Sequence, residues 1–235
     1  GNPDVYIMPA VSGEPKRLTW HSGNDEVQYW TPDGKRILFS SARGPMAWDS
    51  PLYTVGIDAD LPIAIEMGSG AAGMFSQDGS MLAFNRTRYP DPKRHYKGSN
   101  NADVWVMNVR QNTFTQLTDL KLEEYKEAVH DANPMFGADG WIYYMSERDG
   151  TFNIWKVNPG VGPRGGAAAQ VTKHSRGGVR FPSISADGKT ITYSNEFDLW
   201  VLPIDRPTPK RIPIDLGYVI DHTLTEVAST DNVAA

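Results

Sequence analysis

The sequence contains no cysteine among its 235 residues. A disulfide framework and a thiolate metal site are therefore both excluded, while the compartment stays open between cytoplasm and periplasm. No run of about eighteen apolar residues occurs, so we expect no transmembrane helix and no membrane partner. The 23 basic residues are outnumbered by 28 acidic ones, giving a net charge of −5. Such a chain lacks the basic stripe of a nucleic-acid-binding protein.

Motifs of catalysis and cofactor binding are scarce as well. The sequence has no Gly-x-Ser-x-Gly, so the nucleophile elbow of an α/β-hydrolase is missing. Residues 68–73 fit Gly-x-Gly-x-x-Gly, but they lie between two predicted strands, which is typical of a glycine-rich connector rather than a dinucleotide site. His21 and His174 recur at the same place in a repeat, which favours turn chemistry over metal ligation. We expect no catalytic residue, cofactor or metal in this segment.

A turn signal that ends in Asp-Gly occurs four times, each time before an apolar strand. The copies are Thr31–Gly34, Ser76–Gly79, Gly137–Gly140 and Ser185–Gly188, and their spacings are 45, 61 and 48 residues. Asp-Gly between apolar runs predicts a β-hairpin with a tight primed turn, which needs positive φ at both central residues. A repeat of this period is typical of a β-propeller built from four-stranded blades.

A second strand recurs with an aliphatic residue followed by an aromatic one. The aliphatic residues, 47, 52, 50 and 45 apart, are Val5, Leu52, Val104, Ile154 and Leu199. Because side chains alternate along a strand, the aliphatic and the aromatic residues face opposite sides of the sheet. In a propeller both faces of a blade meet neighbouring blades, so apolar residues on both faces are expected. We therefore interpret the in-register Trp105, Trp155 and Trp200 as packing residues.

A third repeated element ends in threonine and completes a four-stranded unit. Residues 16–19, 115–118 and 169–172 match well, and their polar content suits an outermost edge strand. The sequence predicts an all-β chain, a β-propeller of four-stranded antiparallel blades. The predicted divisions are a half blade at 1–20, blades at 26–66, 71–118, 131–172 and 180–213, and the start of a further blade at 217–235.

The predicted ring is incomplete. Propellers have about four to eight blades, and six blades of about 48 residues would need roughly 290 residues. We therefore expect a fragment of a longer polypeptide. Two insertions interrupt the period, at 88–101 and at 119–130, and the second has the pattern of a short helix. Long insertions in repeat proteins map to loops on one face, which is often a binding face.

Several segments resemble one protein family. Residues 1–10, 13–19 and 30–35 are similar to the amino-terminal propeller of tricorn-type serine peptidases, as are 93–98, 141–150 and 179–183. The resemblance runs from residue 1 to about residue 216, while the Pro-Asp-Gly repeat alone is shared with TolB-type propellers. It implies a six-bladed parent propeller, a downstream serine-peptidase domain of the same polypeptide, peptide substrates and homo-oligomers. This segment would then gate or guide peptides without catalysing their hydrolysis.

The basic and aromatic residues of the first insertion form the candidate peptide-binding site. They are Lys93, Arg94, His95, Tyr96 and Lys97. Lysine and arginine can hold peptide carboxylates, and a tyrosine can pack against side chains. The same cluster could instead pair with a neighbouring subunit or blade. Two other functions stay open: a TolB-like periplasmic protein-interaction propeller, and the propeller of a prolyl-oligopeptidase-type enzyme.

Overall fold

The structure is a computed structural model that describes residues 1–44, 50–86, 96, 101–118, 129–161 and 166–214. Within these ranges all regular secondary structure is β-strand. The described residues include no helix with the length and apolarity that a membrane crossing requires. The all-β prediction is therefore confirmed, whereas the predicted short helix at 119–130 lies almost wholly outside the described residues.

The strands form four antiparallel sheets of four strands each, preceded by a two-stranded hairpin. The hairpin consists of β1 (Tyr6–Ile7) and β2 (Lys16–Arg17). The first sheet holds β3 (Asp25–Trp30), β4 (Arg36–Ser41), β5 (Pro51–Gly56) and β6 (Ile63–Ser69). The second holds β7 (Ala71–Phe75), β8 (Met81–Asn85), β9 (Val104–Asn108) and β10 (Thr113–Gln116). The third holds β11 (Asp131–Phe136), β12 (Ile142–Ser146), β13 (Asn153–Val157) and β14 (Ala169–Gln170), and the fourth holds β15 (Val179–Ile184), β16 (Thr190–Asn195), β17 (Asp198–Pro203) and β18 (Lys210–Ile212).

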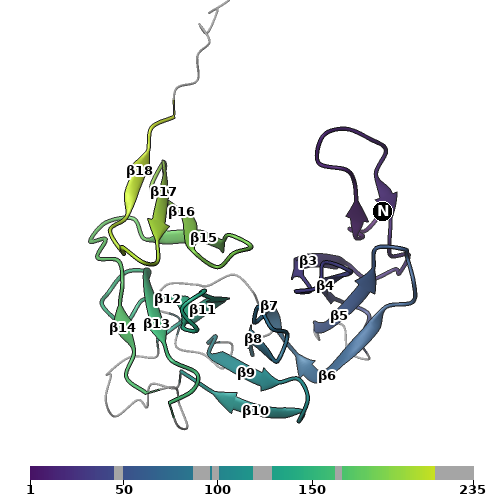
Figure 1. Cartoon of the computed structure of the whole chain (residues 1–235), viewed down its shortest axis with the longest axis horizontal. Helices are drawn as coiled ribbons and strands as arrows, with labels where there is room; N and C mark the ends of the chain where they lie inside the picture. Colours follow the sequence, from purple (N-terminus) through teal and green to yellow (C-terminus); the bar gives the residue numbers. More distant parts are fainter. Residues whose placement is uncertain (45–49, 87–95, 97–100, 119–128, 162–165, 215–235) are drawn as a thin grey trace, which may run out of the picture.

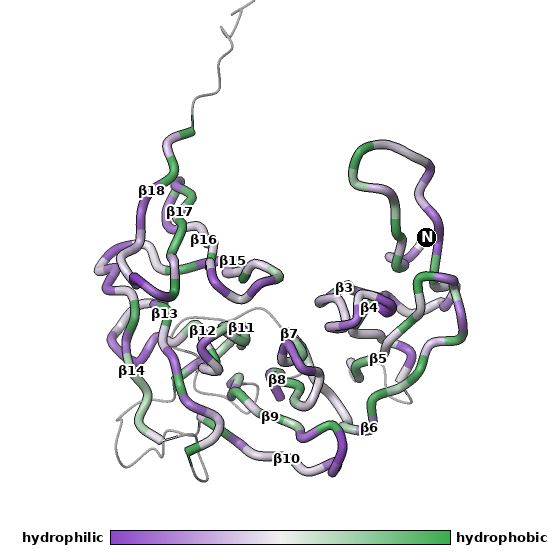
Figure 2. The backbone as a smooth tube through the Cα atoms, viewed as in Figure 1, coloured by the Kyte–Doolittle hydropathy of each residue, from purple (hydrophilic) through white to green (hydrophobic). Residues whose placement is uncertain are grey.

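The four sheets are the blades of a β-propeller. They follow one another around a common centre, with β3, β7, β11 and β15 innermost and β6, β10, β14 and β18 outermost (Figure 1). The outer strand β18 is mostly hydrophilic, with Lys210 and Arg211 among its three residues, as expected at an exposed edge (Figure 2). The ring is open between the fourth blade and the N-terminal hairpin. The blade limits given above remain our proposal for the domain boundaries, and the segment 217–235 lies outside the described residues.

The four Asp-Gly turns are not the primed turns that the sequence suggested. In the first copy the Gly34 N–H donates to the Thr31 carbonyl over 2.9 Å, and Gly34 has a φ of 67°. Asp33 is not among the residues with positive φ, so only the glycine uses the left-handed region. The Asp33 carboxylate accepts hydrogen bonds from the Thr31 hydroxyl and the Lys35 N–H, at 2.6 and 3.1 Å. These bonds stabilise a longer loop, and they lower the pKa of Asp33.

In the second and third blades and in the N-terminal hairpin, a repeated threonine ties the outer strand to the aromatic strand. The hydroxyl of Thr172 accepts the N–H of Ile154 over 2.8 Å, and that of Thr118 accepts the N–H of Val104 over 2.9 Å. In the N-terminal hairpin Thr19 does the same at 3.0 Å. All three threonines are buried. Because a buried, unpaired N–H is costly, this bond explains why the motif recurs in the sequence.

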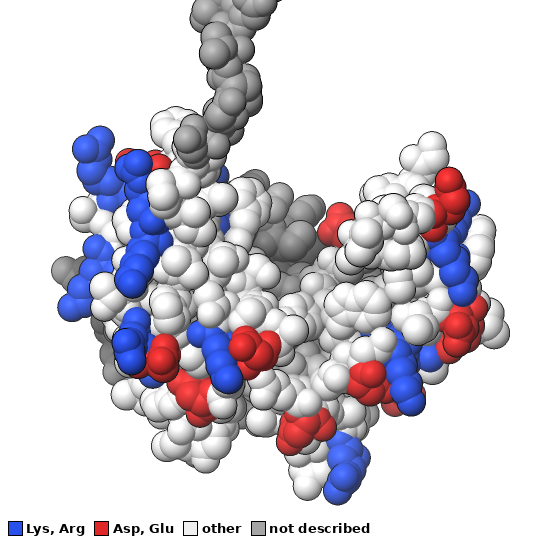
Figure 3. Space-filling view, turned by 45° about the horizontal axis from the view of Figure 1, so that its top comes forward, with Lys and Arg blue, Asp and Glu red and all other residues white. Residues whose placement is uncertain are grey.

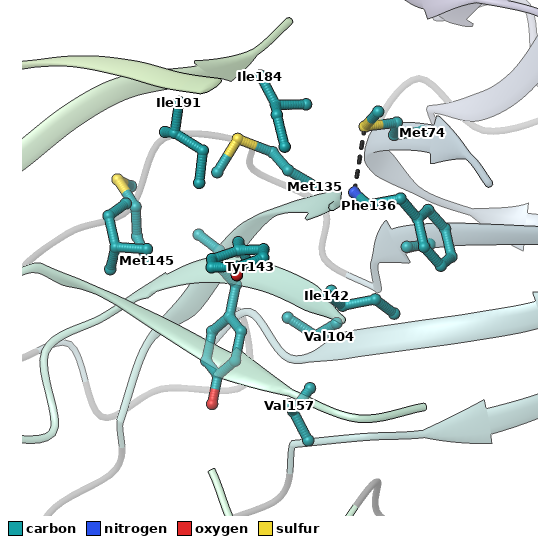
Figure 4. Packing of buried hydrophobic residues seen from close by; sticks show 14 of the residues in the cluster. Met74, Val104, Met135, Phe136, Ile142, Tyr143, Met145, Val157, Ile184 and Ile191 are labelled. Atoms are coloured by element: carbon teal, nitrogen blue, oxygen red, sulfur yellow. Dashed lines mark hydrogen bonds between the residues drawn. The ribbon is translucent and has the colours of Figure 1, made fainter. Parts of the chain in front are cut away.

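The hydrophobic cores lie between blades. One cluster joins the second, third and fourth blades, a second joins the first and second, and a third joins the first blade to the N-terminal hairpin. In the largest cluster the Met74 sulfur of β7 accepts the N–H of Phe136 of β11 over 3.4 Å (Figure 4). Trp155 and Trp200 pack against this cluster and Trp105 against the second, as predicted for packing residues.

Candidate functional site on the propeller axis

A β-bulge interrupts the innermost strand of every blade. The register shifts within β3, β7, β11 and β15. In the last three strands a residue in the shifted stretch has positive φ: Ala72 at 51°, Asn133 at 54° and Phe181 at 51°. A bulge bends its strand and re-aims the side chains that follow. Four bends at corresponding places shape the centre of the ring.

The bulged stretches line a pocket that is open on one side and has a volume of about 160 Å³. Each innermost strand supplies three consecutive residues to its wall. They are Val27, Gln28, Tyr29, Ala72, Gly73, Met74, Asn133, Pro134, Met135, Pro182, Ser183 and Ile184. None of these lining residues carries a charge. We call this the axial pocket.

Tyr29 joins the first blade to the fourth across the axial pocket. Its hydroxyl donates to the Ile184 carbonyl over 3.1 Å, although the two residues are 155 positions apart. Burial raises the pKa of Tyr29, so the phenol stays protonated and able to donate near neutral pH.

The Asp-Gly turns meet at one end of the axis. The Gln77 side-chain amide of the second blade donates to the Asp187 carbonyl of the fourth over 2.8 Å. The Ala138 N–H of the third blade donates to the Gly188 carbonyl, also over 2.8 Å. A Cβ at Gly188 would lie 2.7 Å from the Ala138 nitrogen. Three blades are therefore linked through their turns at this end.

Buried ion pairs lie at the opposite ends of two innermost strands. In the third blade Asp131, the first residue of β11, binds Arg148 with oxygen–nitrogen distances of 3.0 and 3.1 Å. The guanidinium also donates to the Ser146 hydroxyl over 2.9 Å and lies 4.7 Å from the ring centroid of Trp155. The side chains of Arg148 and Asp131 are only 7% and 1% exposed.

The first blade repeats this arrangement. Arg43 binds Asp25 over 2.6 Å and the Ser41 hydroxyl over 2.7 Å. Its guanidinium lies over the rings of Phe39 and Tyr53, at 5.3 and 5.1 Å from their centroids. Because these charges are paired with each other, they fix the strand ends rather than offer free charge to a ligand.

The wall of the axial pocket is uncharged, and so is much of the described surface at the centre of the molecule. Figure 3 shows a hollow between the fourth blade and the first, with uncharged surface at the centre of the view and Lys, Arg, Asp and Glu side chains toward both sides and in a row across its lower part. The described residues hold no cluster of three or more His, Asp or Glu arranged to bind a metal ion. What the axial pocket offers chemically is contact with uncharged groups.

The two histidines in register have local roles that differ in detail. The ring of His21 accepts the Gly23 N–H over 2.9 Å, which is turn chemistry as predicted. His174 instead links two blades, because its ring contacts the Tyr193 hydroxyl at 2.9 Å and the Asn195 amide at 3.1 Å. Burial lowers the pKa of His174.

None of the candidate residues from the first insertion is among the residues that line the axial pocket. Lys93, Arg94, His95 and Lys97 lie outside the described residues, and Tyr96 is half-buried. That binding site therefore stays a prediction.

The sequence analysis did not predict the bulged strands. Pro134 and Pro182 lie within two of them and are a usable signal, because proline inside a sheet favours bulges and edges.

Comparison with known proteins points to one family. The family described as "Tricorn protease N-terminal beta propeller domain" matches residues 1–208. The tricorn protease of Thermoplasma volcanium is 25% identical over 233 residues, covering 95% of this chain and 20% of its own length. The chain spans about a fifth of the length of the curated relatives it matches.

Solved structures share the fold. A crystal structure of the tricorn protease superposes with a TM-score of 0.74 at 21% identity, over 92% of this chain and 20% of that chain. TolB from Acinetobacter baumannii superposes with a TM-score of 0.64 at 17% identity, over 88% of this chain and 47% of that one. At these identities the likeness concerns the architecture alone.

Proposed function

Since the chain belongs to the family of tricorn protease N-terminal β-propeller domains, we propose that it is a non-catalytic propeller segment of a tricorn-like serine peptidase. Its role is to gate or guide peptides to or from a catalytic domain elsewhere in the same polypeptide. That polypeptide would work as a homo-oligomer, with peptides as its partners. We place that polypeptide in the cytoplasm or the periplasm.

The axial pocket is the observation that carries this proposal. All four blades contribute residues to its wall, so a peptide that binds there contacts the innermost strands of the blades. A helix with its side chains is about 10–12 Å across, which is too wide for a pocket of about 160 Å³. A helix therefore cannot enter, whereas a single side chain of an extended, unfolded segment can, and such segments are what a peptidase must receive.

The test compares long and short substrates in the complete polypeptide. The Ser183→Trp variant places a large ring at an exposed position that lines the pocket, and Arg180→Trp places it at an exposed position of the same strand outside the lining. We expect Ser183→Trp to slow hydrolysis of an unfolded protein several-fold relative to Arg180→Trp. Hydrolysis of a fluorogenic dipeptide should be equal in the two variants. Equal rates on both substrates would refute the guiding role.

The isolated chain should hydrolyse no peptide. Turnover by the isolated chain that a single substitution within it abolishes would refute the non-catalytic assignment.

Two alternatives remain distinguishable. A TolB-like interaction propeller would bind a folded protein and have no peptidase domain in its polypeptide. A prolyl-oligopeptidase-type enzyme would carry a Gly-x-Ser-x-Gly hydrolase domain. The TolB structure resembles this chain in architecture, which does not favour its function here. The complete coding sequence discriminates among all three, because a tricorn-like parent should encode a second propeller and a serine-peptidase domain.

A further inference from the structure

We propose that the axial pocket is a receptor for one uncharged, ring-sized side chain of an extended peptide, entered from the side away from the Asp-Gly turns. The preferred residue is aromatic or branched aliphatic. This inference rests on the proposed function in one respect, because it takes the ligand to be a peptide.

The volume sets the size of the occupant. Small-molecule sites usually enclose about 300–1,000 Å³, so a pocket of about 160 Å³ is too small for several residues at once. An apolar cavity of about 150 Å³ is known to hold benzene. The axial pocket therefore matches one aromatic ring or a side chain of similar bulk.

The wall sets the polarity of the occupant. Most lining residues are apolar, including Val27, Met74, Met135 and Ile184, and the polar ones, such as Ser183, are uncharged. Met74 and Met135 are 6% and 5% exposed, and methionine adapts its shape to an aromatic neighbour. A lysine or glutamate side chain would lose its hydration here without gaining an opposite charge from the wall, which disfavours it.

The innermost strands recognise side chains rather than add the peptide as another strand. Pro134 and Pro182 lie in β11 and β15 and lack the N–H that a neighbouring strand would require. The bulges at Asn133 and Phe181 break the regular spacing of the remaining backbone groups. Strand addition depends on such main-chain hydrogen bonds, so specificity at this site comes from the pocket.

The turns set the direction of entry. Gln77 and Ala138 donate to the carbonyls of Asp187 and Gly188, and these bonds link three blades at the turn end of the axis. A peptide main chain cannot pass between these groups while the bonds hold. The side chain therefore enters from the end where Asp25 begins β3, and the peptide backbone stays outside.

The experiment uses the full chain with its methionine methyl groups labelled by ¹³C for NMR. The probes are the blocked tripeptides acetyl-Gly-X-Gly-amide, with X as Phe, Leu, Ala or Lys. We expect saturable shifts of the Met74 and Met135 methyl signals with Phe and Leu, and binding weaker by about tenfold or more with Ala or Lys. The signal of Met8, which is 58% exposed, should not move.

A matched pair of variants tests the location. Val27→Trp fills the pocket from a residue that is 55% exposed, so overpacking of the core is avoided. Glu26→Trp adds the same ring at the neighbouring exposed position, outside the lining. Val27→Trp should abolish the shifts and Glu26→Trp should preserve them. Equal binding of the Phe and Lys tripeptides, or full binding by Val27→Trp, would overturn the inference.

Failure of this inference and failure of the proposed function are separable. Selective tripeptide binding together with unaltered hydrolysis of unfolded protein by Ser183→Trp would support the receptor and refute the guiding role. Slower hydrolysis of unfolded protein by Ser183→Trp, together with equal binding of the Phe and Lys tripeptides, would support the guiding role and refute the receptor.

Discussion

Replacing Arg148 by methionine removes the partner of a carboxylate that has almost no contact with water. Asp131 is 1% exposed at its side chain, and one nitrogen of Arg148, Nη2, lies 3.0 and 3.1 Å from its two oxygens. Methionine keeps much of the length and apolar bulk of the arginine stem. The variant therefore tests the charge rather than the volume.

The expected loss is large because the remaining charge stays buried. Breaking a buried ion pair from one side typically costs about 3–5 kcal/mol of unfolding free energy. Loss of the cation–π contact with Trp155 at 4.7 Å acts in the same direction. For a chain of this size each kcal/mol lowers the melting temperature by roughly 2–4 °C. We therefore expect a drop of about 6–20 °C in Arg148→Met.

Urea and thermal unfolding, followed by tryptophan fluorescence and by circular dichroism, measure this loss. The matched control is Arg211→Met, because the Arg211–Asp198 pair is 62% and 38% exposed and spans 3.5 Å. An exposed pair contributes about 0–1 kcal/mol. The double variant Arg148→Met with Asp131→Asn should lose less than the sum of its single variants, because no unpaired charge remains. If Arg148→Met were as stable as Arg211→Met, the account of the blade ends as buried ion pairs would be refuted.

Three further predictions concern the repeat, the axis and the pH response. Thr172→Val should cost about 1–3 kcal/mol of unfolding free energy, because the buried Ile154 N–H loses its acceptor; a urea midpoint equal to that of the unmodified chain would contradict this. Gly188→Ala should be clearly more destabilising than Gly140→Ala in thermal unfolding, because both glycines have positive φ but a Cβ at Gly140 meets no atom within 4 Å; equal losses would show that the turns do not pack together. Burial lowers the pKa of His130 to about 4, so the unfolded chain binds its proton first and the free energy of unfolding should decrease as the pH falls from about 6.5 toward 4. Urea titrations of His130→Leu should show a shallower decrease over the same range, and an unchanged slope would exclude this histidine as the cause.

Much of the architecture could be read from local residue patterns. Asp-Gly turns, the aliphatic–aromatic strand and the terminal threonine each act within one blade, and each reflects hydrogen bonds or side-chain alternation over a few residues. The type of turn was predicted wrongly, because the Asp33 carboxylate and the Thr31 hydroxyl stabilise a loop in which only Gly34 needs positive φ. Side-chain hydrogen bonds of this kind compete with the backbone preference on which the prediction was based.

The axial pocket could not be read in the same way. Its wall joins residues more than a hundred positions apart, such as Tyr29 and Ile184, and their approach depends on the angle between blades. The sequence pointed instead to the charged insertion around Lys93 and Arg94, whose role stays a prediction. A cluster of charged residues is visible in the sequence itself, whereas this pocket is made of uncharged residues on bulged strands that are far apart in the sequence.

One repeated position separates what the sequence determined from what the tertiary structure decided. The aliphatic residues Val5, Leu52, Val104 and Ile154 have no exposed surface, whereas Leu199, in the same register, is 47% exposed. The sequence determined that each lies on a strand and which face it occupies, because side-chain alternation is a local property of the backbone. Burial was decided by the ring: the first four residues each face an adjacent element, and the described residues place no further blade beyond the fourth, so the same pattern leaves Leu199 partly in water.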